Sequence, residues 1–272
     1  MAKVNIKAYT EWSWIFGDYV PSAYYEKTKG NEVEVETFHC AEQFFYFADS
    51  IVNNRSLMEP PSIGTNALYS HELPKSFKEN WLPPPYKNYY SKISKLKPSK
   101  PVFLINNKYN DEWNMGPQNY LSVEFLDKIF KSKISDVFEF YYIRYDGNCT
   151  DLLDGYHDDA VVAPDFGDYG LISKYKNIKT IYDVIDEHRI GFNEAQMWML
   201  SHAKNIVSVN GGNAVLSAYF GENLFIYGCN DCNSTNRGIW KTNSWLKHLG
   251  GSNIFGYTDY ELLLKEVEEK CI

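Results

Sequence analysis

The sequence predicts an α/β protein made of two doubly wound units, each with a parallel sheet. Short apolar runs alternate with helical segments along most of the 272 residues, and a proline-rich stretch divides this alternation into two series. A hydrophobic fraction of 44% provides enough apolar side chains for one large domain or two small ones. We place the domain boundary after residue 99, which gives an N-terminal domain of residues 1–99 and a C-terminal domain of residues 100–272.

The first series begins at the N-terminus. Strands are expected over residues 3–9 and 33–38, and helices near 19–27 and over 41–52. Alternation of this kind implies parallel strands joined by crossover helices. Prolines then punctuate residues 58–101. Because proline lacks a backbone donor and blocks helix continuation, we expect irregular chain or short helices there, leading to the boundary.

The second series follows the proline-rich stretch. Residues 102–106 form a short apolar run typical of a buried parallel strand, and Ser122 is expected to cap an amphipathic helix. Further strands are expected over residues 138–144, 206–209, 224–227 and 253–257, and further helices over 180–188, 193–204, 214–220 and 259–270. In the last helix, Leu262, Leu263 and Val267 form an apolar stripe.

Charge and composition narrow the choice of partner. A formal net charge of -8 argues against binding of nucleic acid, because affinity for a phosphate backbone comes from clustered Lys and Arg. The chain has 22 Tyr, 16 Phe and 7 Trp, whose rings can stack on sugar faces, although an aromatic core would use them equally well. We therefore expect small molecules or neutral glycans as partners.

Location and metal content follow from simple counts. No apolar run reaches the roughly 18 residues of a membrane helix, and the N-terminus lacks a signal-like apolar region, so we expect a cytoplasmic protein without a transmembrane segment. The five cysteines are an odd number and are expected to be reduced. Cys229 and Cys232 have the spacing of half a zinc knuckle, but no second pair of ligands accompanies them, and we expect no metal.

The segment 205–221 contains the most informative motif. A predicted strand ends at Gly211 and Gly212 and runs directly into a helix, which leaves backbone N–H groups available for a diphosphate. Because an open parallel sheet binds ligands at the carboxyl ends of its strands, the stretch from Ser208 through Ala214, which includes Asn213, should border the binding crevice. A Gly-Gly turn can equally be a simple break between strand and helix.

The segment from residue 100 to the C-terminus resembles the nucleotide-sugar-binding domain of GT-B glycosyltransferases, found in glycan gene sets of bacteria and large DNA viruses. The resemblance rests on residues 100–109, 111–113, 116–120, 144, 193–196 and 208–221. It implies two Rossmann-like domains, a nucleotide sugar as donor substrate without a further cofactor, and a glycan hydroxyl as acceptor.

The N-terminal half carries a second resemblance. Gly17-Asp18, with Pro21 three positions after the aspartate, is similar to the Gly-Asp-x-x-x-x-Pro turn of heptosyltransferase-like enzymes, although the proline comes earlier here. This likeness implies that Asp18 is the general base that deprotonates the acceptor. Glu11 and His39 are the reserve candidates, since both lie near predicted strand ends of the N-terminal sheet. Asp18 can equally be a helix N-cap.

The departing diphosphate needs positive charge or N–H dipoles. Arg144, at the end of a predicted strand, is the best guanidinium candidate for bidentate contact, and Lys108 could act beside it. Both residues could also lie on a solvated surface. Glu194 could accept hydrogen bonds from hydroxyl groups of the donor, or it could simply begin a helix.

Asp-x-Asp, the pair that holds the metal in GT-A enzymes, is missing from the sequence, and the acidic stretch 151–168, with Asp158 and Asp159, is expected to be a solvated loop. The function predicted is an inverting, metal-independent glycosyltransferase, with a UDP-sugar such as UDP-xylose favoured over a GDP-sugar as donor. Two alternatives stay open, a nucleotide-sugar epimerase of the same fold and a non-catalytic glycan- or nucleotide-binding module.

Overall fold

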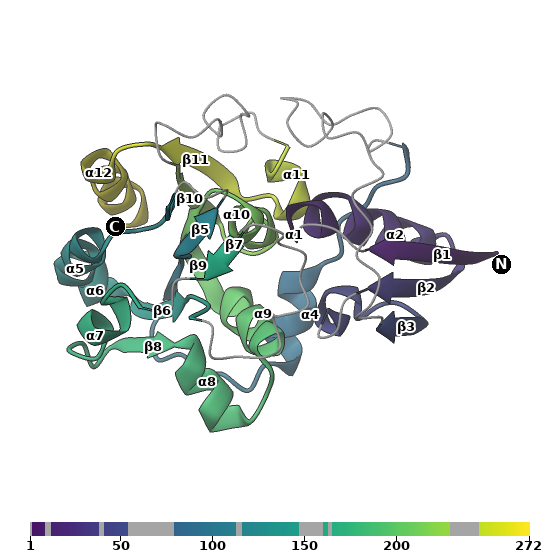
Figure 1. The fold of residues 1–272 in the computed structure, drawn as a ribbon, viewed down its shortest axis with the longest axis horizontal. Helices are drawn as coiled ribbons and strands as arrows, with labels where there is room; N and C mark the ends of the chain where they lie inside the picture. The colour runs from purple at the N-terminus through teal and green to yellow at the C-terminus, as the bar shows by residue number, and fades with distance from the viewer. Residues whose placement is uncertain are drawn as a thin grey trace.

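The computed structural model describes residues 2–8, 12–37, 41–53, 79–112, 116–146, 160–162, 165–228 and 245–272. Its framework is two parallel sheets, one of three strands in the order β1-β2-β3 and one of six in the order β11-β10-β9-β4-β6-β8 (Figure 1). A separate antiparallel ribbon joins β5 (Asn110–Glu112) and β7 (Ala160–Val162). The predicted class, α/β with parallel sheets, is therefore confirmed.

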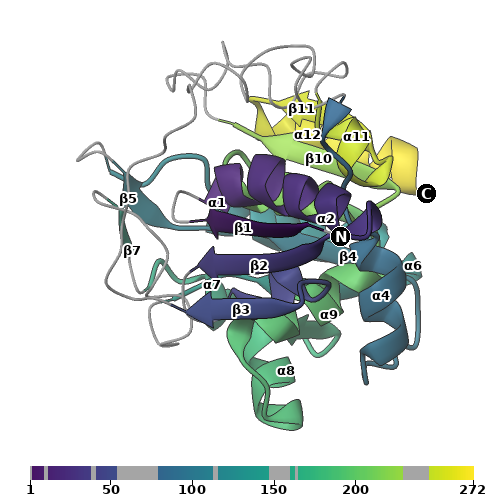
Figure 2. The ribbon, with the colours of Figure 1, turned by 90° about the vertical axis from the view of Figure 1, so that its right-hand side faces the viewer.

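The small sheet comes from the N-terminal segment. It consists of β1 (Lys3–Ala8), β2 (Glu32–Thr37) and β3 (Ser50–Asn53), whose arrows point the same way in Figure 2. Residues 33 and 35 are buried while their neighbours face outward, as expected when one face of a sheet is packed. The helix predicted over 41–52 is wrong, because only the short η2 (Glu42–Phe45) forms before β3 pairs with β2.

The first helical segment begins earlier than predicted. It runs through α1 (Trp12–Trp14), the π-helical turn η1 (Ile15–Tyr19) and α2 (Val20–Thr28). Pro21 has no N–H to offer the carbonyls one turn before it. Those of Phe16 and Gly17 instead accept hydrogen bonds from the Tyr219 hydroxyl, at 2.5 Å, and the Trp81 indole, at 2.8 Å. Side chains from distant parts of the chain thus complete this turn.

The large sheet has a doubly wound strand order. Its strands are β4 (Val102–Asn106), β6 (Glu139–Ile143), β8 (Ile178–Thr180), β9 (Ala203–Val209), β10 (Asn223–Tyr227) and β11 (Asn253–Tyr257). The chain moves outward from β4 through β6 to β8, then returns to pair β9 with the other side of β4 and continues outward through β10 to β11. The direction of winding therefore reverses between β4 and β9. The short β8 lies in a segment where the sequence predicts no strand.

Helices cover both faces of this sheet. One face packs against α5 (Val123–Lys131), α6 (Ile134–Val137), α7 (Asp168–Ile172) and α12 (Tyr260–Cys271), and the other against α8 (Ile181–His188), α9 (Phe192–His202) and α10 (Gly212–Ser217), with α11 (Lys247–Gly250) beside them. Ser122 caps α5 as predicted. In α12, Leu263 and Val267 are buried but Leu262 is 47% exposed, so its place in the apolar stripe is wrong. Within the described ranges, no helix combines the length and apolarity needed to span a membrane.

The two sheets share one apolar core. Val35 of the small sheet and Leu104 of the large sheet belong to the same buried cluster. The helix α4 (Tyr86–Ile93), formed within the proline-rich stretch, links them, since the Tyr86 hydroxyl donates to the Phe44 carbonyl and its ring lies 4.8 Å from that of Tyr219. The sequence boundary at residue 99 stays a prediction, because the core continues across it.

Candidate functional site

The point where the winding reverses lies between the carboxyl ends of β4 and β9. Asn106 and Ser208 are register partners there, and Lys108 and Gly211 follow them just beyond the two strands. In doubly wound sheets the crossovers diverge at this point and leave room for a ligand outside the strand ends. The fold therefore brings together Lys108, Ser208 and Gly211, three residues that the sequence analysis proposed separately.

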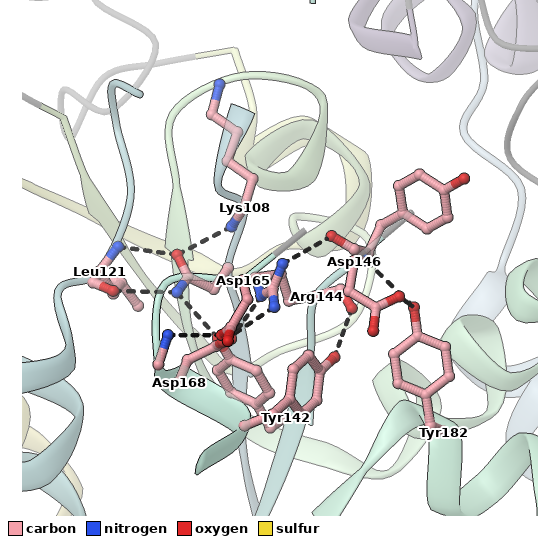
Figure 3. Close-up of polar contacts among 12 residues, drawn as sticks. Lys108, Leu121, Tyr142, Arg144, Asp146, Asp165, Asp168 and Tyr182 are labelled. Carbon is pink, nitrogen blue, oxygen red and sulfur yellow. Dashed lines mark hydrogen bonds and ion pairs between the residues drawn. The ribbon is translucent and has the colours of Figure 1, made fainter. Parts of the chain in front are cut away.

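The glycine turn after β9 has a conformation that few other residues adopt. Gly211 has φ 122° and ψ -157°, a region of backbone space that essentially only glycine occupies. A Cβ atom added to Gly211 would lie 3.6 Å from the Lys108 ammonium nitrogen, so this charge sits beside the turn. Figure 3 shows the Lys108 side chain extending away from the buried polar network beneath it.

Gly212 has a different neighbour. A Cβ atom at Gly212 would lie 3.1 Å from Cβ of Trp12 and 3.4 Å from the backbone nitrogen of Ser13. The start of the N-terminal helical segment thus approaches the beginning of α10 closely, and both α1 and η1 pack against α10. Part of the requirement for glycine at this position comes from contact between the two units.

Asn107 fixes the backbone around Lys108. Its side-chain oxygen accepts from the N–H groups of Lys108, at 2.9 Å, and Leu121, at 2.8 Å, while its amide nitrogen donates to the Leu121 carbonyl and the Tyr142 hydroxyl, each at 3.1 Å (Figure 3). The Asn213 amide donates to the Asn107 carbonyl at 3.1 Å. Because the Asn213 side chain binds the backbone of Asn107, just beyond β4, donor contact by Asn213 stays a prediction for its backbone alone.

Two buried polar atoms near the switch point have unused hydrogen-bonding capacity. Among the residues that the structure describes, no hydrogen-bond partner reaches Oγ of Ser208 or Oδ1 of Asn210, although the two residues are 0% and 5% exposed. Ser208 is the next-to-last residue of β9, and Asn210 directly follows the strand. An unsatisfied buried polar group is costly and calls for a partner such as a ligand or water. Asn210 lies inside the stretch from Ser208 to Ala214 that the sequence analysis placed along the crevice, although it was not among the residues proposed to contact the donor.

Arg144 occupies a different environment from the one expected. It is completely buried, and its Nε and Nη2 atoms both donate to the carboxylate of Asp168, the second at 2.9 Å. Asp168 also accepts from the Tyr142 hydroxyl at 2.6 Å (Figure 3). The expectation of a solvated loop is wrong for Asp168, which is buried at the start of α7. Contact of Arg144 with a diphosphate stays a prediction, for a guanidinium that is buried and already paired with Asp168.

Asp18 lies inside the helical run, within η1, so neither the predicted Gly-Asp turn nor the N-cap interpretation holds. Its side chain is only 7% exposed, and Ser22 donates to it at 3.4 Å. Burial raises the pKa of Asp18 from 3.8 to about 6, partly opposed by the hydrogen bond from Ser22. A carboxylate that titrates near neutral pH is suited to accept a proton from a hydroxyl group.

The remaining candidates are dispersed. Glu194 is half-buried in the first turn of α9. The pKa of Tyr90 in α4 is raised mainly by the burial of Tyr90, and the negative charge of Glu194 contributes to the same shift. Donor contact by Glu194 stays a prediction. Glu11, His39, Asp158, Asp159, Cys229 and Cys232 lie outside the described residues. Within the described part of the chain, no cluster of three His, Cys, Asp or Glu side chains could hold a metal ion.

Comparison with known proteins adds one finding. No known family model and no curated protein matches the sequence. Among solved structures, the E. coli ADP-heptose LPS heptosyltransferase II is similar with a TM-score of 0.58, and the match covers 99% of this chain and 98% of that chain. The two sequences are 8% identical, so the likeness establishes the fold alone. The chain has the two-unit α/β arrangement of GT-B type that the sequence resemblance implied.

Proposed function

We propose that the protein is a glycosyltransferase that uses a nucleoside-diphosphate sugar. The observation that carries the proposal is the strand-order reversal between β4 and β9, where the Lys108 ammonium lies beside the Gly211 turn, in a fold that matches a heptosyltransferase over nearly its whole length. Supporting features are the unused hydrogen-bonding atoms of Ser208 and Asn210 at the same strand end.

In this proposal the donor diphosphate lies between Lys108 and the backbone of residues 211–213. Lysine acts as a point charge against the phosphate oxygens, and the glycines let the backbone approach them. The charge that grows on the departing diphosphate is then offset by groups already in position. Arg144 does not need to contact the diphosphate, because its ion pair with Asp168 holds it in the buried polar network beneath Lys108.

Transfer requires a base for the acceptor. The acceptor oxygen attacks C1 of the donor sugar as Asp18 removes its proton, while the bond from C1 to the diphosphate oxygen breaks and that oxygen keeps the electron pair. Attack opposite the leaving group inverts the configuration at C1. The proton then passes from Asp18 to solvent before the next turnover. Asp18 is proposed for this role because its helical segment packs against α10 at the switch point and its pKa is near 6.

The finer assignments are part of the same proposal. The donor is a UDP-sugar, with UDP-xylose as the first choice, the acceptor is a glycan hydroxyl, and no further cofactor is needed. An epimerase of this fold would convert the donor without an acceptor, and a binding module would convert nothing. Measuring consumption of the donor with and without a glycan acceptor separates the three functions.

Binding of the donor tests the placement at Lys108. Lys108→Ala is expected to weaken UDP and UDP-sugars roughly 10- to 150-fold, because a hydrogen bond to a charged group contributes about 1.5–3 kcal/mol. Thermal-shift titration measures this, since a ligand at about 100 Kd adds roughly 2.7 kcal/mol to the stability of the folded state. The control is Lys176→Ala, which removes an exposed lysine from the loop before β8. Equal affinity in the Lys108 and Lys176 variants would contradict the placement.

Metal independence is a separate prediction. Donor consumption is expected to survive excess EDTA with at most a modest change, since a lysine and fixed N–H dipoles can replace a bound cation in stabilising the leaving diphosphate. The assay compares rates before and after chelation, and again after Mg²⁺ or Mn²⁺ is returned. Abolition by EDTA with recovery on adding either metal would show that transfer is metal-dependent.

A further inference from the structure

We infer that the nucleobase of the donor stacks on the ring of Tyr109, which Phe166 and Tyr120 support; these three residues are here called the aromatic trio. The inference rests on the proposed function. It extends that function to the nucleobase, for which none of the residues discussed so far provides a contact. Tyr109 directly follows Lys108 in the chain, so the trio begins one residue from the proposed diphosphate contact.

Two of the three rings stack face to face, and the third contacts both of them edge-on. Tyr109 and Phe166 lie face to face with their centroids 4.2 Å apart and their planes 17° from parallel. Tyr120 meets both of them edge-on, at 4.9 Å from Tyr109 and 5.8 Å from Phe166. All three residues are half-buried, unlike the fully buried Phe103 and Phe140 in the core of the same unit.

Charged and polar groups beneath the trio hold it in place. The guanidinium carbon of Arg144 lies 5.2 Å from the centroid of Phe166, within the range of a cation–π contact, and Arg144 is itself fixed by Asp168. The Asn107 amide binds the backbone at Lys108 and at Leu121, the residues that flank Tyr109 and Tyr120. A surface fixed in this way binds a flat ring without a large ordering cost.

The order of groups along the sheet edge indicates which end of the donor reaches the trio. Gly212, after β9, contacts Trp12 at the start of the helical segment that carries Asp18. Lys108 follows the next strand, β4, and Arg144 beneath the trio follows β6 on the far side of β4. The reacting sugar must face Asp18, so the opposite end of the diphosphate, which carries the nucleoside, points toward the trio.

The experiment measures binding of UDP, ADP and inorganic pyrophosphate to the full chain by calorimetry. Tyr109→Leu and Tyr109→Gln remove the ring, Tyr109→Phe keeps it, and Tyr175→Leu is the control. Tyr175 is also half-buried and packed on a phenylalanine, but it lies near the amino end of β8, at the opposite edge of the sheet. Thermal melts followed by circular dichroism establish that each variant is folded. One folded variant without the Tyr109 ring is enough for the test.

Loss of the ring is expected to weaken UDP or ADP roughly 5- to 150-fold, the range given by base–aromatic stacking, with pyrophosphate affinity unchanged. Tyr109→Phe and Tyr175→Leu should bind like the parent. Unchanged nucleotide affinity in a folded ring-removing variant would overturn the inference, and so would an equal loss for pyrophosphate, which would mean that the trio only positions Lys108. If the parent chain itself binds neither nucleotide, the proposed function fails together with it.

Discussion

Asp18→Asn is expected to lower turnover by roughly 100-fold or more while making the folded protein more stable at neutral pH. The loss follows from removal of the general base, a contribution of about 10²–10⁴ in rate. The gain follows from removal of a buried negative charge, since Asp18 is 7% exposed and the hydrogen bond that its side chain accepts from Ser22 is long, at 3.4 Å. A residue whose replacement costs activity but improves stability is retained for function.

The pH dependence of both quantities can be derived from the pKa of Asp18, which burial raises from 3.8 to about 6. The folded state binds this proton more tightly than the unfolded state, so stability falls as pH rises from about 4 to about 6 and then stays level, a penalty on the order of 2–3 kcal/mol. Asp18→Asn should abolish this dependence. Turnover needs the ionised form and should therefore rise through about pH 6 to a plateau.

Ser22→Ala provides the matched control for Asp18. The Ser22 hydroxyl lowers the pKa of Asp18, so its removal should move the midpoint of the pH–rate profile upward while leaving the plateau nearly intact. Profiles of kcat, with chemical denaturation over the same pH range, measure these effects. Near-normal turnover in Asp18→Asn would sink the assignment and transfer the role to Glu11 or His39.

Arg144→Ala is expected to produce the largest loss of stability, about 3–5 kcal/mol, because it leaves the Asp168 carboxylate buried without its cation. This outcome differs from the one that a direct diphosphate contact would produce. Replacement of a residue that contacts the diphosphate should selectively weaken binding of the nucleoside diphosphate and leave the free energy of unfolding unchanged. Denaturation in urea and nucleotide titration of the same preparation measure both quantities.

A double substitution separates the ion pair from general damage to the site. Asp168→Ala should also be strongly destabilising, and Arg144→Met combined with Asp168→Leu should cost less than the sum of the two single losses, because no buried charge is then left unpaired. If Arg144→Ala kept parental stability and lost only diphosphate binding, Arg144 would be a ligand contact and the structural role assigned here would be wrong.

Much of the large sheet was predictable because the signals are local. Residues 102–106, 206–209 and 224–227 are short runs that are apolar except for Asn106 and Ser208, and they lie in the buried strands β4, β9 and β10. Polar side chains at helix starts were equally readable, and the side chains of Ser122 and Thr180 both accept hydrogen bonds from the third residue of their helices. The small sheet was harder, since β3 is only four residues long and depends on pairing with β2.

By itself, the sequence determined the α/β class, the buried strands and the Gly211-Gly212 turn, because each of these depends on residues that are neighbours in the chain. Only the tertiary structure decided what the polar residues do. Arg144 finds its carboxylate 24 residues away in Asp168, and the Phe16 carbonyl that Pro21 cannot satisfy finds the Tyr219 hydroxyl 203 residues away. The burial that raises the pKa of Asp18 also comes from packing of distant segments. Charge, burial and hydrogen bonding depend on what lies nearby in space, and spacing along the chain does not specify that.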